Sequence, residues 1–488
     1  MGPSNAGYFF LMTQISKKQI YLYIAIYFGI RIFSYFFSPA TPLYFANPVN
    51  WIVSTTILLV VVYFLLKKDI HGWLLIASGM VLGGAGSFLE IKGIYLRTFL
   101  LVFSIAIFTY QTIKEKKYNI FLENKTILFA FLALYTIVGM SALRGYYAGH
   151  NLKLVIADTL PYLFFLYYFP IKELLKSEKF RKAVFNMLIV AVICNFVFVY
   201  FTLVAFSSGI FVLQDSYYHW FRDVASGKIT DYGTGFFRIL LNEQLLLVPL
   251  FLWLFAKQIY SENTKKIVFI ISGMALLAVL SINITRIYLV GLAVGILFLF
   301  SFKNWKRWLA YSAGALGFFI IAFTLTHLGA TKGKSLGWEY LGLRLQSIAM
   351  PQTEDSSLSR LLLLPKIMEK IKAHPLLGNG LGDTVTAYSP IFKANITTPH
   401  FDWGYLEIIA EMGVLGLMIW GLIIGYLILK IKQNRGLLAS VIALLVINIT
   451  SPALFHVMGI ILIAYFFSVN KATPLPNSQA TSPMAIGK

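Results

Sequence analysis

Charged residues are scarce in this 488-residue chain, since Asp, Glu, Lys and Arg together make up only 12% of it. A soluble globular domain carries about 25% charged residues, so the composition excludes an ordinary soluble protein. Hydrophobic residues make up 58% of the chain. They gather in runs of roughly 15 to 25 residues, the length that carries a helix across a bilayer. The sequence therefore predicts an all-α, polytopic membrane helix bundle.

Signatures of several enzyme classes are also missing. The single cysteine, Cys194, excludes an intramolecular disulfide and a CxxC motif. The seven histidines are scattered without the spacing of metal ligands. There is no phosphate-binding P-loop and no GxSxG motif. The sequence therefore predicts neither a cofactor nor a metal ion.

About fourteen apolar segments are read as membrane spans. They lie at 19–37, 51–66, 73–89, 97–113, 126–143, 158–170, 183–207, 239–256, 266–282, 287–302, 308–326, 404–429, 436–450 and 453–470. We expect a single polytopic membrane domain over residues 1–470. The remainder, 471–488, is rich in Pro, Ser, Thr and Ala and is expected to be a disordered cytoplasmic tail.

The chain has 41 Lys and Arg against 20 Asp and Glu, a formal net charge of +21. Its basic clusters lie at 17–18, 67–68, 114–125, 172–182, 257–266, 303–307 and 430–435. With the spans above, all of them fall on one side of the membrane, which identifies that side as the cytoplasm. We therefore predict a multi-pass inner-membrane protein with both termini in the cytoplasm and no nucleic-acid partner.

On the opposite side, the longest segment is 327–403. Its stretch 357–374 has apolar residues on one helical face, which predicts an amphipathic helix over the membrane end, and Pro365 would kink it or start a second helix. The sequence PLLGNGLG follows, with Gly378, Gly380 and Gly382. These glycines permit either a simple turn or a close approach of the backbone to a ligand.

Three arginines stand at predicted membrane borders: Arg238, Arg286 and Arg360. Any one of them could be an interfacial anchor whose side chain extends toward water. Several on one face would instead suit a lipid-linked phosphate, because a guanidinium binds phosphate oxygens in bidentate fashion and stays charged.

A polar motif leads into the span at 404–429. His400 is a candidate general base or a solvated loop residue, and Asp402 is an equally good base candidate. Glu407 and Glu411 are four residues apart and so share a helix face. The two glycines that follow would allow a neighbouring helix to approach closely.

In this order, the motifs resemble the O-antigen ligase and polymerase family of bacterial membrane glycosyltransferases. The resemblance covers about 235–420. It rests on Arg238, Thr285-Arg286, Ser359-Arg360-Leu361, the stretch 375–382, Leu406, Glu411, Gly413 and Gly416. The family's histidine position falls at Asp402, with Trp403 beside it, and His400 stands two residues earlier. Either residue could therefore be the base.

The resemblance implies transfer of a glycan from an undecaprenyl-diphosphate-linked donor to a hydroxyl of a glycan or glycolipid acceptor on the periplasmic side. The enzyme would be a metal-independent ligase or repeat-unit polymerase of lipopolysaccharide or exopolysaccharide biosynthesis. The implied roles are diphosphate binding (Arg238, Arg286, Arg360), catalysis (His400, Asp402) and support (Glu411, Gly378, Gly380, Gly382). The alternative function is a transporter or flippase of lipid-linked saccharides.

Overall fold

The computed structural model describes residues 17–84, 87–122, 125–260, 266–350, 355–389, 393–399 and 401–469. The predicted tail at 471–488 lies outside these residues, as does His400. Eight helical segments of the described chain are long and apolar enough to cross a membrane. Strands in the same residues form only two-stranded sheets. The predicted all-α, polytopic helix bundle is confirmed.

The α-helices of the described residues differ widely in length. The long helices are α1 (Lys17–Phe36), α2 (Ala46–Leu66), α4 (Leu96–Lys114), α6 (Lys125–Tyr147), α9 (Glu178–Ser207), α12 (Lys266–Asn283), α14 (Trp305–Ala330), α16 (Asp355–Ala373) and α17 (Gly404–Ile431). The short ones are α3 (Ile70–Val81), α5 (Asn119–Leu122), α7 (Leu152–Leu163), α8 (Tyr168–Leu174), α10 (Asp215–His219), α11 (Leu247–Tyr260), α13 (Arg286–Phe298), α15 (Trp338–Ala349), α18 (Arg435–Ile447) and α19 (Val457–Val469).

Three antiparallel hairpins complete the fold. Their strands are β1 (Glu90–Ile91), β2 (Ile94–Tyr95), β3 (Gly227–Asp231), β4 (Phe237–Leu241), β5 (Val385–Ser389) and β6 (Ala394–Thr398). They pair as β1–β2, β3–β4 and β5–β6. In the β3–β4 register, Thr230 lies opposite Arg238.

Two predicted spans have the wrong extent. The span expected at 239–256 begins as strand β4 and a 3-10 turn at Asn242–Leu246, and helix α11 starts only at Leu247. The span expected at 73–89 ends as a helix at Val81. A short apolar run reads the same whether it becomes a buried strand or part of a helix, so hydropathy alone does not distinguish them.

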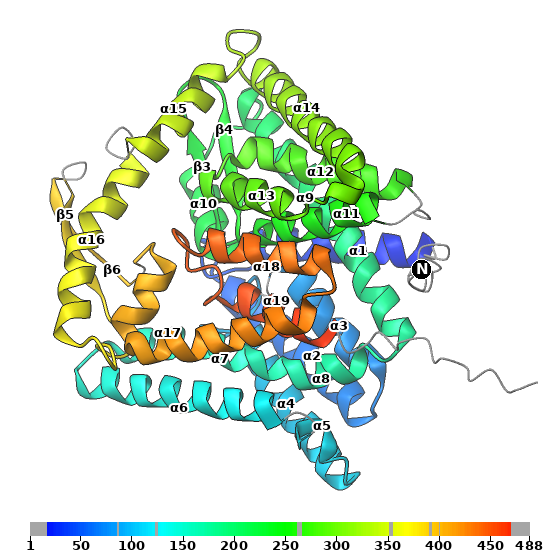
Figure 1. Cartoon of the computed structure of the whole chain (residues 1–488), viewed down its shortest axis with the longest axis vertical. Coiled ribbons are helices and arrows are strands. Elements are labelled where there is room, and N and C mark those ends of the chain that lie inside the picture. The colour runs from blue at the N-terminus through cyan, green and yellow to red at the C-terminus, as the bar shows by residue number, and fades with distance from the viewer. Residues whose placement is uncertain are drawn as a thin grey trace, which may run out of the picture.

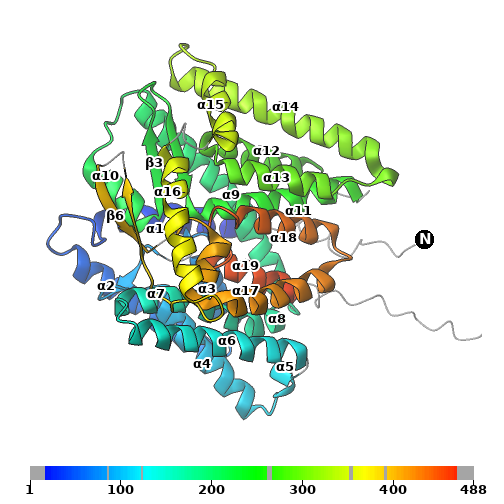
Figure 2. The same ribbon diagram turned by 60° about the vertical axis from the view of Figure 1, so that its left-hand side comes forward.

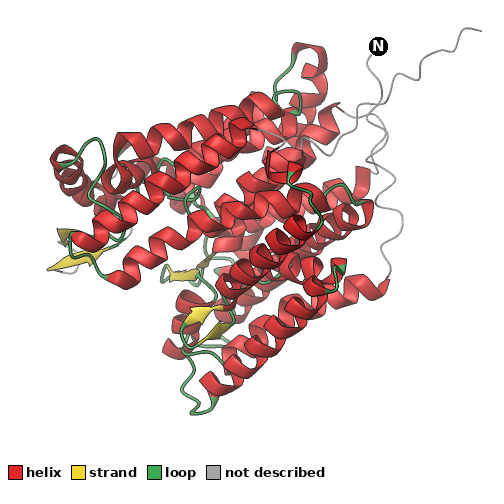
Figure 3. Ribbon diagram, turned by 90° about the horizontal axis from the view of Figure 1, so that it is seen from below, coloured by secondary structure: helices red, strands yellow, loops and turns green. Residues whose placement is uncertain are grey.

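The hairpins gather at one end of the bundle. Figure 2 shows β3 and β6 at the left, together with α10, and the connections α13–α14 and α17–α18 at the right. The same separation is visible from below, where the strands lie toward one side of the aligned helices (Figure 3). We call the end with the hairpins the hairpin end. The basic clusters at 303–307 and 430–435 therefore lie at the opposite end.

Helices α15 and α16 form an arm at the hairpin end, running from α14 toward α17 (Figure 1). The predicted amphipathic helix is confirmed as α16, which continues through Pro365 without dividing. The α16 side chains Leu363 and Ile367 form a small apolar cluster with Val385 and Phe401. This small core is separate from the main bundle core and fixes the arm against the start of α17.

Candidate active site

Four basic side chains from four elements approach one another at the hairpin end. Desolvation lowers the pKa of Lys228 in β3, and the positive charge of Arg238 in β4 lowers it further. Arg344 in α15 and Arg360 in α16 act in the same direction, whereas the negative charge of Asp402 opposes them. A charge shifts a neighbour's pKa only over a short distance, so these five groups form one electrostatic cluster. We call it the arginine cluster.

Arg238 of the cluster and a further arginine, Arg286, are both held near the junction of α12 and α13. The Nε of Arg238 donates to the carbonyl oxygen of Asn283 over 2.6 Å, and its Nη2 donates to Thr285 Oγ1 over 2.9 Å. Arg286, the first residue of α13, donates from Nη1 to Ser347 Oγ on α15. These hydrogen bonds hold both guanidinium groups in place and join the bundle to the arm.

Arg344 was not singled out from the sequence. Its side chain is only 6% exposed, and its guanidinium carbon lies beside the paired rings of Tyr232 and Tyr340, 5.6 and 5.3 Å from their centroids. Its Nε donates to the Tyr340 hydroxyl over 2.9 Å, and Nη2 donates to that of Tyr232. Burial raises the pKa of Tyr340 above its ordinary range, so the phenol stays neutral. The only signal in the sequence was the four-residue spacing of Tyr340 and Arg344 on one helix face.

Asp402 faces Arg360 at the rim of the cluster. The Arg360 Nε and the Asp402 Oδ2 are 3.8 Å apart, and the Asp402 side chain is 47% exposed. The backbone of Asp402 has φ of 58°, an uncommon conformation for an L residue. It is held on both sides, because Trp403 Nε1 donates to the Arg360 carbonyl oxygen over 3.1 Å and the Phe401 amide donates to Glu407 over 3.1 Å.

The glycine-rich loop lies against protein backbone. Gly378, Gly380 and Gly382 all have positive φ, of 69°, 98° and 77°. A Cβ on Gly378 would lie 2.3 Å from the carbonyl carbon of Glu411, and one on Gly380 would lie 2.3 Å from the amide nitrogen of Gly145. A Cβ on Gly382 would meet Val155 of α7, so the space that the three glycines leave is filled by α6, α7 and α17.

Gly413 breaks helix α17 under this loop. Its φ of 70° and ψ of −176° interrupt the helix, and a Cβ there would lie 2.1 Å from the Leu376 carbonyl oxygen. This conformation is essentially restricted to glycine. The expectation that Gly413 serves contact with a neighbouring helix was therefore wrong, because the residue accommodates the loop.

Buried carboxyl groups lie beside the glycine-rich loop. Glu411 is 5% exposed and hydrogen-bonded to Asp158 of α7, which also accepts from the Gly382 amide over 3.0 Å. Asp383 accepts from Lys370 Nζ over 2.7 Å. These contacts join α7, α16 and α17. In the part of the chain that the structure describes, no group of three or more His, Cys, Asp or Glu is placed to hold a metal ion.

Part of the chain is similar to a known protein family. Residues 267–421 match the family model described as O-Antigen ligase. The matched range contains Arg286, Arg344, Arg360 and Asp402, whereas Lys228 and Arg238 lie before it. No curated protein matches the chain.

Proposed function

We propose that this multi-pass membrane protein moves a glycan from an undecaprenyl-diphosphate-linked donor to an acceptor hydroxyl, a proposal supported by the match of residues 267–421 to the O-antigen ligase family model. The acceptor is a glycan or a glycolipid. The product would be a ligated or polymerised surface polysaccharide.

The observation that carries the proposal is the meeting of Lys228, Arg238, Arg344 and Arg360 from two strands and two helices. In the proposed reaction, the acceptor oxygen forms a bond to the anomeric carbon, and the bond from that carbon to the donor phosphate breaks. The bonding electrons leave with the diphosphate. Fixed cations stabilise this charge as it develops, and guanidinium groups bind phosphate oxygens in pairs.

Asp402 stands next to these cations and could accept the proton of the acceptor hydroxyl. A general base must lie within hydrogen-bonding reach of the proton that it removes. Asp402 is partly exposed and close to Arg360, so a hydroxyl at the cluster would lie near it. His400, two residues earlier in the chain, is the second candidate.

We place the reaction at the periplasmic face and both termini in the cytoplasm. The support for this is the basic connections at the end opposite the hairpins, because loops that stay in the cytoplasm are enriched in Lys and Arg. A polyprenyl donor would then reach the arginine cluster from the outer leaflet.

Two features favour an enzyme over a transporter of lipid-linked sugars. The charged residues of the arginine cluster lie at the hairpin end of the bundle. Transporters, in contrast, bind their substrate near the bilayer midplane. Deeper in the bundle, Arg31 and Glu243 pair with each other at 2.5 Å, with exposed fractions of 2% and 8%. That pair is already neutralised within the protein.

Purified protein in liposomes with an undecaprenyl-diphosphate-linked glycan tests the proposal. Longer lipid-linked chains would identify a polymerase, and glycan attached to an added glycolipid would identify a ligase. Asp402→Asn and His400→Ala, measured in parallel, assign the base by the larger loss of initial rate. Movement of the glycan across the bilayer with its original linkage intact would instead establish the transporter.

A further inference from the structure

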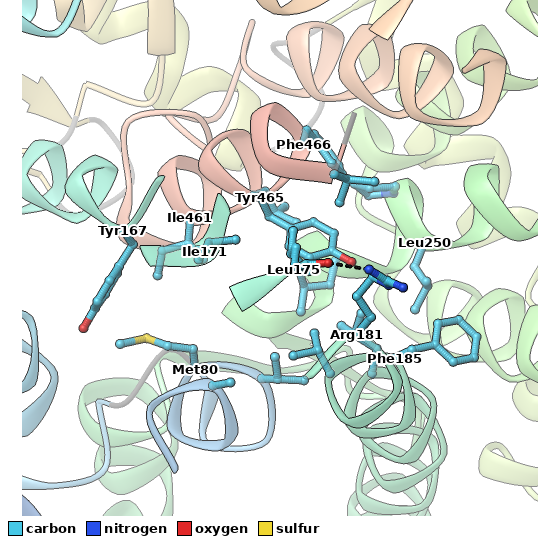
Figure 4. Close-up of a pocket in the computed structure, with 18 of the residues that line it drawn as sticks. Met80, Tyr167, Ile171, Leu175, Arg181, Phe185, Leu250, Ile461, Tyr465 and Phe466 are labelled. Atoms are coloured by element: carbon cyan, nitrogen blue, oxygen red, sulfur yellow. Dashed lines mark hydrogen bonds between the residues drawn. The ribbon is translucent and has the colours of Figure 1, made fainter. Parts of the chain in front are cut away.

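A second feature of the molecule lies away from the arginine cluster. A cavity of about 270 Å³ opens among α3, α8, α9, α11 and α19 (Figure 4). It reaches the turn between α8 and α9, which belongs to the basic cluster at 172–182. The cavity is therefore at the end of the bundle opposite the hairpins, the end assigned above to the cytoplasm.

Its walls are almost wholly apolar. Trp73 and Ile76 contribute from α3, Leu250 and Trp253 from α11, and Phe466 from α19. Helices of a membrane protein are surrounded by acyl chains, and a cavity of this composition accepts such a chain without exposing polar groups.

Arg181 and Lys257 are cations that line the cavity. Among the described residues that line it, there is no Asp or Glu. Arg181 Nη1 donates to the Leu175 carbonyl oxygen over 2.6 Å, as drawn in Figure 4. Its Nε is buried and makes no hydrogen bond within the described chain. Lys257 Nζ lies 5.8 Å from the centroid of the Trp253 ring.

The neighbouring lysines differ from Arg181 in their partners. Lys176 pairs with Glu173 at 2.8 Å, and Lys182 pairs with Glu178 at 2.6 Å. Arg181 donates instead to backbone carbonyl oxygens of the α8–α9 turn, and its positive charge also interacts with Glu178. Two acids thus stand against three cations, so these five residues in and beside the turn carry a net positive charge.

We propose that this cavity binds one anionic phospholipid, with an acyl chain between α3, α11 and α19 and its phosphate against Arg181 and Lys257. A basic pocket between membrane helices on the cytoplasmic side attracts an anionic head group, whereas a zwitterionic one gains less. The binding does not depend on glycan transfer, because none of the lining residues belongs to the arginine cluster.

The test uses the full chain in nanodiscs with diazirine-labelled phosphatidylglycerol or phosphatidylethanolamine. After irradiation, labelled peptides are mapped by mass spectrometry. We expect phosphatidylglycerol to label peptides of α3 and α19. The double variant Arg181→Gln/Lys257→Gln should reduce that labelling about ten-fold, because each cation near the surface attracts an anionic lipid. The matched control, Lys303→Gln/Lys306→Gln, removes the same charge at the same end outside the cavity and should leave it unchanged.

A cavity-filling variant keeps the proposal testable if the double variant unfolds. Ala77→Phe adds an aromatic ring to the wall at α3 and should abolish labelling by displacing the chain. Equal labelling by both lipids, or labelling that survives both variants, would overturn the proposal. Labelling elsewhere on the protein, with none in α3 or α19, would also overturn it.

Discussion

Removal of the Arg360 guanidinium should slow glycan transfer by about 10- to 150-fold. A hydrogen bond to a charged group is worth about 1.5–3 kcal/mol, and each 1.4 kcal/mol is a factor of ten in rate. We expect Arg360 to meet the leaving diphosphate, because it lies near Lys228 and Asp402. Arg360→Lys should lose less, since it keeps the charge but not the two parallel hydrogen bonds.

The loss of rate should not come from unfolding. The Arg360–Asp402 pair is long, at 3.8 Å, and its side chains are 29% and 47% exposed. Exposed pairs of this kind contribute less than about 1 kcal/mol to stability. Arg360→Ala should therefore keep a thermal midpoint and an elution volume close to those of the unaltered protein.

The assay is the initial rate of transfer in liposomes at saturating acceptor. The matched control is Arg222→Ala, which removes an exposed guanidinium near β3 that is paired with Asp223 at 2.7 Å. It should retain the full rate. An Arg360→Ala protein that is folded and keeps more than half of its rate would refute the role of Arg360, as would an equal loss in Arg222→Ala.

Three further changes test other parts of the structure. Desolvation and neighbouring cations lower the pKa of Lys228, so Lys228 should lose its proton at a pH below the ordinary lysine range. In a pH–rate profile, kcat/KM should therefore fall as pH rises through this lowered pKa, and Lys228→Arg should abolish that fall. Gly413→Ala should destabilise the protein by about 2–5 kcal/mol through backbone strain and overlap, seen as a lower thermal midpoint, whereas Gly425→Ala in an open part of the same helix should not. Glu243→Ala should cost about 3–5 kcal/mol in the same measurement, because it leaves Arg31 buried without its carboxylate, and an unchanged midpoint would contradict that pairing.

Part of the candidate site could be predicted from the chain alone. Arg238, Arg286 and Arg360 stand out because a guanidinium is costly near hydrocarbon and therefore conspicuous there. Lys228 and Arg344 did not stand out. Lys228 lies in a strand of the segment between spans, and Arg344 lies in a short helix whose apolar pattern resembles many others. Their importance comes from their neighbours, which only the folded chain brings together.

The glycine-rich loop was also predictable only in part. The stretch at 375–382 predicted a simple turn or a close approach of the backbone to a ligand. The positive φ values of its glycines agree with a turning backbone, whose close approach is to other backbone of this chain. The partner of that approach was not predictable, because contacts with Gly145 and Glu411 join residues far apart in the chain. Hydropathy likewise located the span after 239 but not its first strand, β4.

The sequence by itself determined that this chain lies in a membrane as a helical bundle, and which connections carry the positive charge. These properties follow from composition and period, because lipid leaves the backbone almost no alternative to a helix. Tertiary structure decided which cations meet, which carboxyl groups are buried and what the glycines approach. Each of those depends on side chains from distant elements lying within a few ångströms, and spacing along one chain does not encode that distance.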